Sequence, residues 1–129
     1  MGHEAAPFAA VVSSLQFWGA PLLTIAISAA YFFAADPSAG FGRRALWSAH
    51  GVAAAVIYFG AMAVWITGAS RPSLGTVFLW LSLLPIALIL YSLVGFRGKR
   101  LVHVLQVPNL VAIVWGTFIG AMAATGDWL

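Results

Sequence analysis

Four long stretches without a charged side chain dominate the hydrophobic pattern of this chain. They cover residues 5–35, 45–70, 72–96 and 101–126. A helix that crosses a membrane needs about 20 mostly apolar residues, at a rise of about 1.5 Å per residue, and each stretch reaches that length. The pattern therefore predicts an all-α membrane protein with four transmembrane helices, at approximately residues 8–35, 45–67, 75–95 and 101–125.

The connections between the predicted helices are short. The segments Asp36-Pro37-Ser38 and Arg71-Pro72-Ser73 are typical of turns, because proline fixes φ and serine can cap the helix that follows. None of the connections has room for a soluble domain. We therefore expect a single domain over residues 1–129, built as an up-down four-helix bundle.

The composition supports a membrane environment and narrows the range of partners. Apolar residues make up 63% of the chain and charged residues 7%, whereas soluble domains carry about 25% charged residues. The lipid bilayer is thus one expected partner. The net charge of +3 comes from a few basic residues in the connections, so no nucleic-acid surface is predicted. The absence of cysteine excludes thiolate metal sites.

The basic residues are distributed unevenly between the two sides of the predicted bundle. The first and third connections hold five of the six, and the second holds one: Arg43, Arg44, Arg97, Lys99 and Arg100 against Arg71. Short loops rich in lysine and arginine stay in the cytoplasm. We therefore predict that loops one and three are cytoplasmic and that both termini lie outside, in a bacterial cytoplasmic membrane.

Two short patterns occur twice. A basic loop followed by a histidine appears as GFGRRALWSAH at residues 40–50 and as GFRGKRLVH at 95–103, and the tetrapeptide GAMA appears at 60–63 and 120–123. These echoes raise the hypothesis that the bundle consists of two duplicated helical hairpins. His50 and His103 are not equivalent when the loops are aligned on Arg44 and Arg100, so the hypothesis predicts no symmetric histidine pair.

Polar residues are concentrated on one face of the fourth predicted helix. At 100° per residue, His103, Gln106 and Asn109 fall within about 120° of one another. Polar side chains in hydrocarbon are costly without partners, so this arc should face other helices or another subunit. Pro108 lies within the arc, and its missing N–H should free the carbonyl of Val104 and distort the helix there.

The histidines are the candidate cofactor ligands. His50 and His103 are predicted at similar depths near the cytoplasmic side, where two imidazoles could ligate the iron of haem b or contact a quinone head group. They would be metal ligands only if haem is bound. Gln106 and Asn109 would complete this cofactor site. The alternative is structural, with each histidine bonded to a backbone carbonyl, a loop or a lipid phosphate.

Two functions from different classes follow from these observations. The sequence shows no catalytic signature and no carboxylate at membrane depth, which disfavours hydrolases and proton- or sodium-coupled carriers. The first function is an accessory or assembly subunit of a larger membrane complex, or a homo-oligomer, with Gly116-x-x-x-Gly120 allowing close helix approach. The second is a haem b- or quinone-binding electron-transfer membrane protein that uses His50 and His103.

Overall fold

The computed structural model describes residues 15–96 and 98–127, and it is helical without a strand over those residues. Its elements are α2 (Leu15–Ala34), the 3-10 helix η1 (Pro37–Ala39), α3 (Phe41–Ile66), α4 (Leu74–Leu81), α5 (Leu83–Gly95), α6 (Arg100–Val104) and α7 (Gln106–Thr125). Four helical spans are long and apolar enough to cross a membrane: Phe17–Ala34, Phe41–Ile66, Leu74–Gly95 and Val102–Thr125. The predicted all-α class with four transmembrane helices is confirmed.

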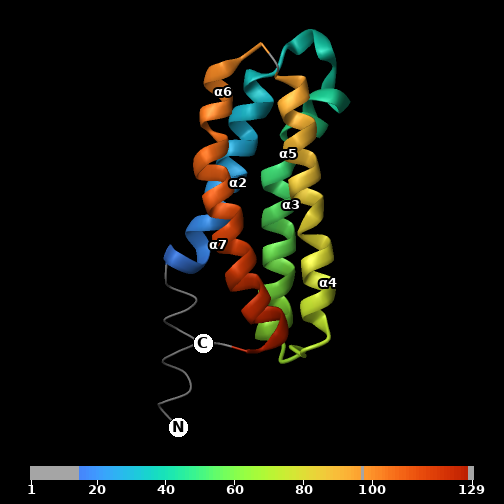
Figure 1. The fold of residues 1–129 in the computed structure, drawn as a ribbon, viewed down its shortest axis with the longest axis vertical. Helices are drawn as coiled ribbons and strands as arrows, with labels where there is room; N and C mark the ends of the chain where they lie inside the picture. The colour runs from blue at the N-terminus through green and yellow to red at the C-terminus, as the bar shows by residue number, and fades with distance from the viewer. Residues whose placement is uncertain (1–14, 97, 128–129) are drawn as a thin grey trace.

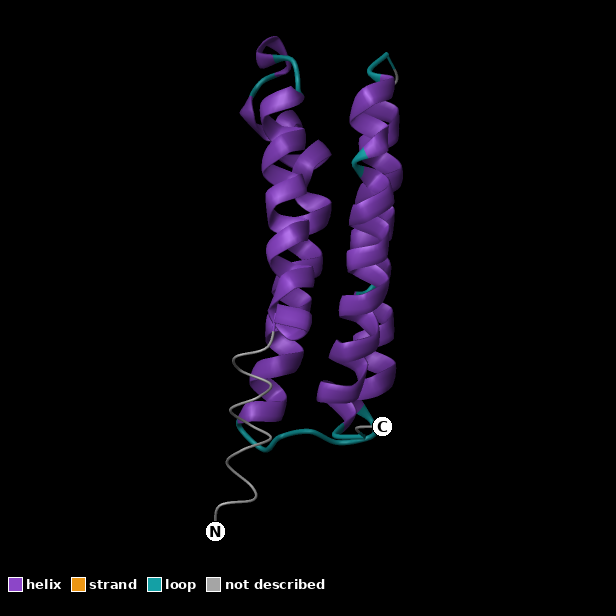
Figure 2. Ribbon diagram, turned by 90° about the vertical axis from the view of Figure 1, so that its left-hand side faces the viewer, coloured by secondary structure: helices purple, strands orange, loops and turns teal. Residues whose placement is uncertain are grey.

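The spans run alternately up and down (Figure 1). The segment around η1 and the turn before α6 lie at one end of the bundle, and the connection 67–73 lies at the other. Figure 2 shows two hairpins, α2–α3 and α4–α7, joined by that connection. Helix α3 contacts α2, α5 and α7, so it is the helix that joins the two hairpins most extensively.

Proline interrupts two of the four spans. The third span breaks at Ser82, three residues before Pro85, and the fourth breaks at Leu105, three residues before Pro108. A proline cannot donate to the carbonyl four residues earlier, and its ring crowds that carbonyl. The distortion expected at Pro108 is therefore present. Pro21 lies inside α2, which continues without a break in assignment.

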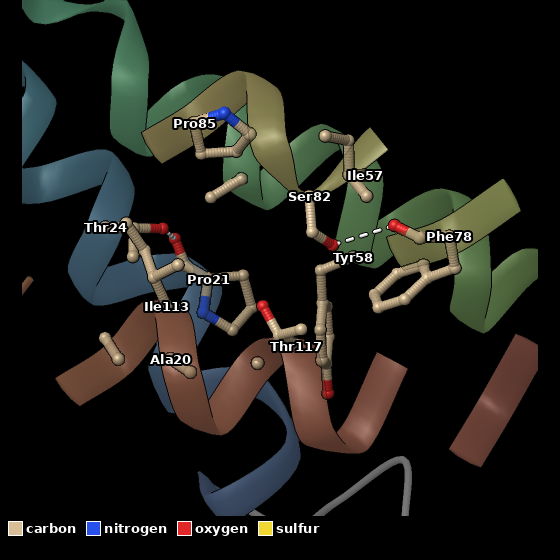
Figure 3. A pocket seen from close by; sticks show the side chains of 13 residues that line it. Ala20, Pro21, Thr24, Ile57, Tyr58, Phe78, Ser82, Pro85, Ile113 and Thr117 are labelled. Atoms are coloured by element: carbon tan, nitrogen blue, oxygen red, sulfur yellow. Dashed lines mark hydrogen bonds between the residues drawn. The ribbon is translucent and has the colours of Figure 1, made fainter. Parts of the chain in front are cut away.

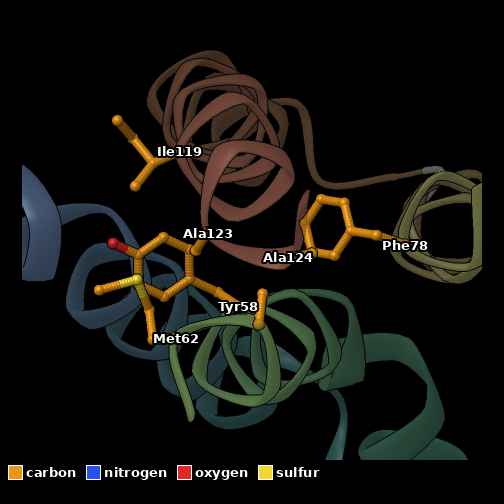
Figure 4. Packing of buried hydrophobic residues seen from close by; sticks show 7 residues of the cluster. Tyr58, Met62, Phe78, Ile119, Ala123 and Ala124 are labelled. Carbon is orange, nitrogen blue, oxygen red and sulfur yellow. The ribbon is translucent and has the colours of Figure 1, made fainter. Parts of the chain in front are cut away.

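Buried apolar side chains form two clusters along the bundle. The cluster nearer the connection 67–73 is drawn in Figure 4, where the Phe78 ring of α4 lies beside Ala124 of α7. Its buried members are Tyr58, Ala61, Met62, Phe78, Ile119, Ala123 and Ala124. The second cluster, at the end that carries the basic loops, consists of Ile27, Tyr31, Ala35 and Phe96.

The repeated tetrapeptide does not bury the same positions in its two copies. In α3, Gly60 is exposed and Met62 is buried, whereas in α7 Gly120 is buried and Met122 is only partly buried. Both copies nevertheless contribute to the cluster around Phe78. The two copies of the tetrapeptide thus turn different positions toward the core. The duplication of the hairpins stays a hypothesis.

The glycine pair of α7 packs within this chain. Gly116 and Gly120 are both buried. A Cβ atom at Gly120 would collide with the Phe78 ring, and one at Gly116 would lie 3.6 Å from Cδ2 of Tyr58. The close approach expected for this motif therefore takes place between α7 and the chain's own α3 and α4. This corrects the assignment of the motif to association with a partner.

Candidate functional site

A histidine sits at the centre of the bundle, in the half nearer the basic loops. His50 of α3 has no exposed surface, and the same is true of Asn109 in α7 and Ser92 in α5. Gln106, one turn before Asn109, is 5% exposed. Because α3 contacts both α5 and α7, the three helices bring these side chains to one point. We refer to His50, Ser92, Gln106 and Asn109 as the polar cluster.

Hydrogen bonds connect every member of the polar cluster. The Asn109 amide nitrogen lies 3.1 Å from Nδ1 of His50 and donates to the Gln106 side-chain oxygen over 2.9 Å. The Gln106 amide nitrogen lies 3.5 Å from Nε2 of His50 and donates to the Ser92 hydroxyl over 3.4 Å. Both imidazole nitrogens therefore face side-chain amides, a kind of partner that hydrocarbon cannot provide.

Tyr31 closes the site from the side of α2. Its ring is fully buried and meets the His50 imidazole edge to face, with 4.9 Å between ring centroids. The Tyr31 hydroxyl donates to the carbonyl of Val102 in α6 over 2.9 Å. A tyrosine near the end of a span would be expected at the headgroup level. The Tyr31 hydroxyl finds its acceptor inside the bundle, on the backbone of α6.

The residues predicted from sequence are only partly brought together. His50, Gln106 and Asn109 share the polar cluster, whereas His103 lies in α6, beyond the helix break, and is partly exposed. Among the described residues no hydrogen bond or ring contact joins His103 to His50, and Nδ1 of His103 is buried without a hydrogen-bond partner. The arrangement therefore holds one imidazole firmly and leaves the other outside the cluster.

Two residues of the site were not found by sequence reasoning. Ser92 is a lone serine in an otherwise apolar stretch, and nothing in its neighbourhood marks it as a site residue. Tyr31 had a usable signal, because Thr24, Ser28 and Tyr31 recur at helical spacing on one face of α2, and all three are buried. That spacing predicts an inward polar face.

A small cavity lies deeper in the bundle, toward the middle of the spans (Figure 3). Its volume is about 20 Å³, close to what one water molecule occupies, and Pro21, Ser82 and Thr117 are among its lining residues. The hydroxyl of Ser82 donates to the Phe78 carbonyl over 2.8 Å, as drawn in Figure 3. The cavity is far smaller than a haem or a quinone head group requires.

Basic side chains from both loops converge on the carboxyl end of α2. Arg44 donates to the Phe32 carbonyl over 3.0 Å and lies 4.4 Å from the centre of the Phe32 ring. Lys99 donates to the Ala34 carbonyl. The last carbonyls of a helix have no helical donor and carry partial negative charge, so cations stabilise them. These residues therefore cap a helix, in addition to any effect on threading.

No metal cluster accompanies the histidine. Within residues 15–96 and 98–127, no group of three or more histidine or carboxylate side chains is placed to hold a metal ion. Comparison of the chain with protein-family models, with curated proteins and with solved structures finds no match. The chemistry of the site therefore has to be argued from its own geometry.

Proposed function

We propose that this protein is an accessory or assembly subunit of a larger membrane complex and acts through contacts on its outer helix faces. The observation that carries the proposal is that the polar side chains of the polar cluster face the inside of the bundle. The polar side chains of the bundle centre bond to one another and have almost no exposed surface. A ligand arriving from the bilayer would reach apolar side chains instead.

The outer face of α7 is the contact surface that we favour. Five exposed apolar side chains form a shallow hollow there: Leu110, Val111, Val114, Trp115 and Phe118. Trp115 lies near the middle of the span Val102–Thr125, although tryptophan prefers the membrane interfaces. Large aromatic side chains are enriched at the centres of protein contacts. A helix from another membrane subunit would therefore suit this face better than lipid does.

Site-directed photocrosslinking in native membranes tests the proposal. A photoreactive amino acid at Val114, on the hollow, should form an adduct with a different polypeptide. The matched control is Leu84, which is exposed near the middle of the third span on another helix and should give none. An adduct at twice the 13.6 kDa chain mass would indicate a homo-oligomer. Equal yields at both positions, or no adduct at either, would contradict the proposed contact face.

A second candidate is electron transfer through haem b or a quinone. The observation in its favour is the buried Nδ1 of His103, which has no hydrogen-bond partner among the described residues and is thus free for ligation. Ligation by both histidines would require His50 to give up the contact with Gln106 or Asn109. A Soret band with sharp reduced α and β bands in the purified protein would support haem, and a featureless visible spectrum would exclude it.

A further inference from the structure

Three side chains of the polar cluster form a closed ring of contacts. Asn109 meets Nδ1 of His50 at 3.1 Å and Gln106 at 2.9 Å, and Gln106 meets Nε2 of His50 at 3.5 Å. One atom of the Asn109 amide makes both of its contacts, whereas Gln106 uses one end of its amide for each neighbour. Each of the three contacts needs one donor and one acceptor, and this requirement couples the three side chains.

A neutral imidazole cannot satisfy all three contacts. With both amides oriented as described above, the amide nitrogens of Asn109 and Gln106 both donate toward His50, so both ring nitrogens would have to accept. A neutral imidazole carries one N–H and has only one acceptor. Turning one amide alone places two donors or two acceptors against each other at the 2.9 Å contact between Asn109 and Gln106. One contact is unmet in every case.

The cation satisfies the whole ring. If both amides turn by 180°, the Gln106 nitrogen donates to the Asn109 oxygen, and each amide oxygen faces one ring nitrogen of His50. Both ring nitrogens must then donate, which an imidazolium does. Of all the combinations of amide orientation and imidazole charge, only the cation with both amide oxygens toward His50 meets the three contacts.

We propose that the ring of His50, Gln106 and Asn109 is a proton-binding site, in which protonation of His50 is coupled to the turning of both side-chain amides. The proton comes from solvent and adds to the ring nitrogen that lacks one, so no other reactant is needed. Hydrogen bonds from the charged form to two amide oxygens favour that form. The site is thus built to hold a positive charge that the low-dielectric interior would otherwise oppose.

The orphaned oxygen of Asn109 supports the same inference. Its Oδ1 is buried and has no hydrogen-bond donor among the described residues, which is a costly arrangement. When the amide turns, this oxygen moves to the position that faces both His50 Nδ1 and the Gln106 amide. It then accepts from two donors, while the amide nitrogen takes the place that the oxygen has left.

The other groups around His50 are compatible with a cation. Tyr31 from α2 places its aromatic ring against the imidazole, and Ser92 from α5 is joined to the ring through Gln106. The Ser92 hydroxyl now donates to the Ile89 carbonyl over 2.7 Å and can rotate toward a turned Gln106 oxygen. No described lysine, arginine or carboxylate bonds to His50, so no ion pair competes with the amide ring.

Nitrogen NMR of the intact protein in lipid bilayers tests the proposal. With ¹⁵N-labelled histidine, asparagine and glutamine, the His50 ring signals are identified by their loss in His50→Gln. We expect both ring nitrogens to be protonated after a single step as the pH is lowered through the range in which the protein stays folded. The side-chain amide signals of Gln106 and Asn109 should shift with the same midpoint. A ring that stays neutral throughout, or amide signals that ignore the step, would overturn the proposal.

Two variants and a control distinguish the effect of the amide ring on the titration midpoint of His50 from the general effect of burial. Gln106→Leu and Asn109→Leu each remove one oxygen acceptor, so the His50 midpoint should fall by at least one pH unit, a tenfold loss of proton affinity. Thr117→Val, elsewhere on α7, should leave the midpoint unchanged. A midpoint that stays the same or rises in both leucine variants would refute the role of the amides. If these variants do not fold, the measurement on the unmodified protein decides alone.

Discussion

The Tyr58 hydroxyl donates a hydrogen bond to the Phe17 carbonyl, the oxygen that lies four residues before Pro21. Proline has no N–H to offer that carbonyl, so α3 supplies the donor that α2 lacks. The bond explains how a proline is tolerated inside an apolar span. It also ties the first two spans together at the end opposite the basic loops.

Tyr58→Phe should lower the free energy of unfolding by about 1 kcal/mol, because a part-buried carbonyl loses its donor. In a Pro21→Ala background the same change should cost less, since the backbone N–H restored at position 21 can serve Phe17. Reversible unfolding of the four proteins in mixed micelles gives this double-mutant cycle. Equal costs in both backgrounds would show that the proline and the hydroxyl are energetically independent.

Gly120→Ala should destabilise the bundle by about 1–3 kcal/mol, because the added methyl group meets the Phe78 ring. Gly60→Ala is the matched control, since it changes the same residue in the other copy of the tetrapeptide, where a Cβ has open space. That substitution should be neutral or slightly stabilising. Thermal unfolding in detergent measures both. If the two variants were equally stable, the packing of α7 against α4 would be misassigned.

The threading prediction concerns which end of the bundle faces the cytoplasm. Ser38 and Ser73 are exposed at opposite ends and can each be replaced by a single cysteine in this cysteine-free chain. We expect Ser38→Cys to be shielded from a membrane-impermeant thiol reagent added outside whole cells, and Ser73→Cys to react. Labelling of both from outside would refute the predicted positions of loops one and three.

The cap on α2 predicts a stability role for a loop lysine. Lys99→Met should lower the free energy of unfolding by about 0.5 kcal/mol, because the Ala34 carbonyl loses a charged donor at a helix end. Arg43→Met removes the same charge from an exposed site at the same end of the bundle and should have a smaller effect. The comparison is made by thermal unfolding at low salt. A larger effect at Arg43 would indicate that general charge, and not the cap, matters.

The turn at Asp36 should respond to acid. The Ser38 backbone N–H donates to the Asp36 carboxylate over 2.9 Å, and this bond holds the pKa of the carboxyl below its ordinary value of 3.8. A depressed pKa in the folded state stabilises the turn above the unfolded value, and the benefit is lost as the pH falls through the folded value. The chemical shift of the Ser38 amide proton should therefore change with a midpoint below pH 3.8 as Asp36 is protonated, and Asp36→Asn should abolish that change. A midpoint above 3.8 would contradict the hydrogen bond.

The sequence alone determined the fold class. Hydrocarbon leaves backbone groups no partner outside the chain, so an uncharged stretch of about 20 residues has to be helical if it crosses a membrane. The same reasoning found the distortion at Pro108, because a missing N–H is a covalent property. It also anticipated partners for Gln106 and Asn109, since the cost of an unpaired amide in lipid does not depend on the details of packing.

Only the tertiary structure decided which helices those residues meet. The periodicity of α7 defines a polar face but not its neighbour, and the contact with His50 depends on α3 lying against both α5 and α7. From the sequence, Gly120 was equally suited to pack against a partner helix or against Phe78. A small residue allows close approach but does not determine which neighbour approaches. The capping of α2 by Arg44 and Lys99 could not be predicted either, because it also depends on contacts between distant parts of the chain. Helix formation is local along the chain, whereas the choice among apolar faces is settled by packing between residues far apart in sequence.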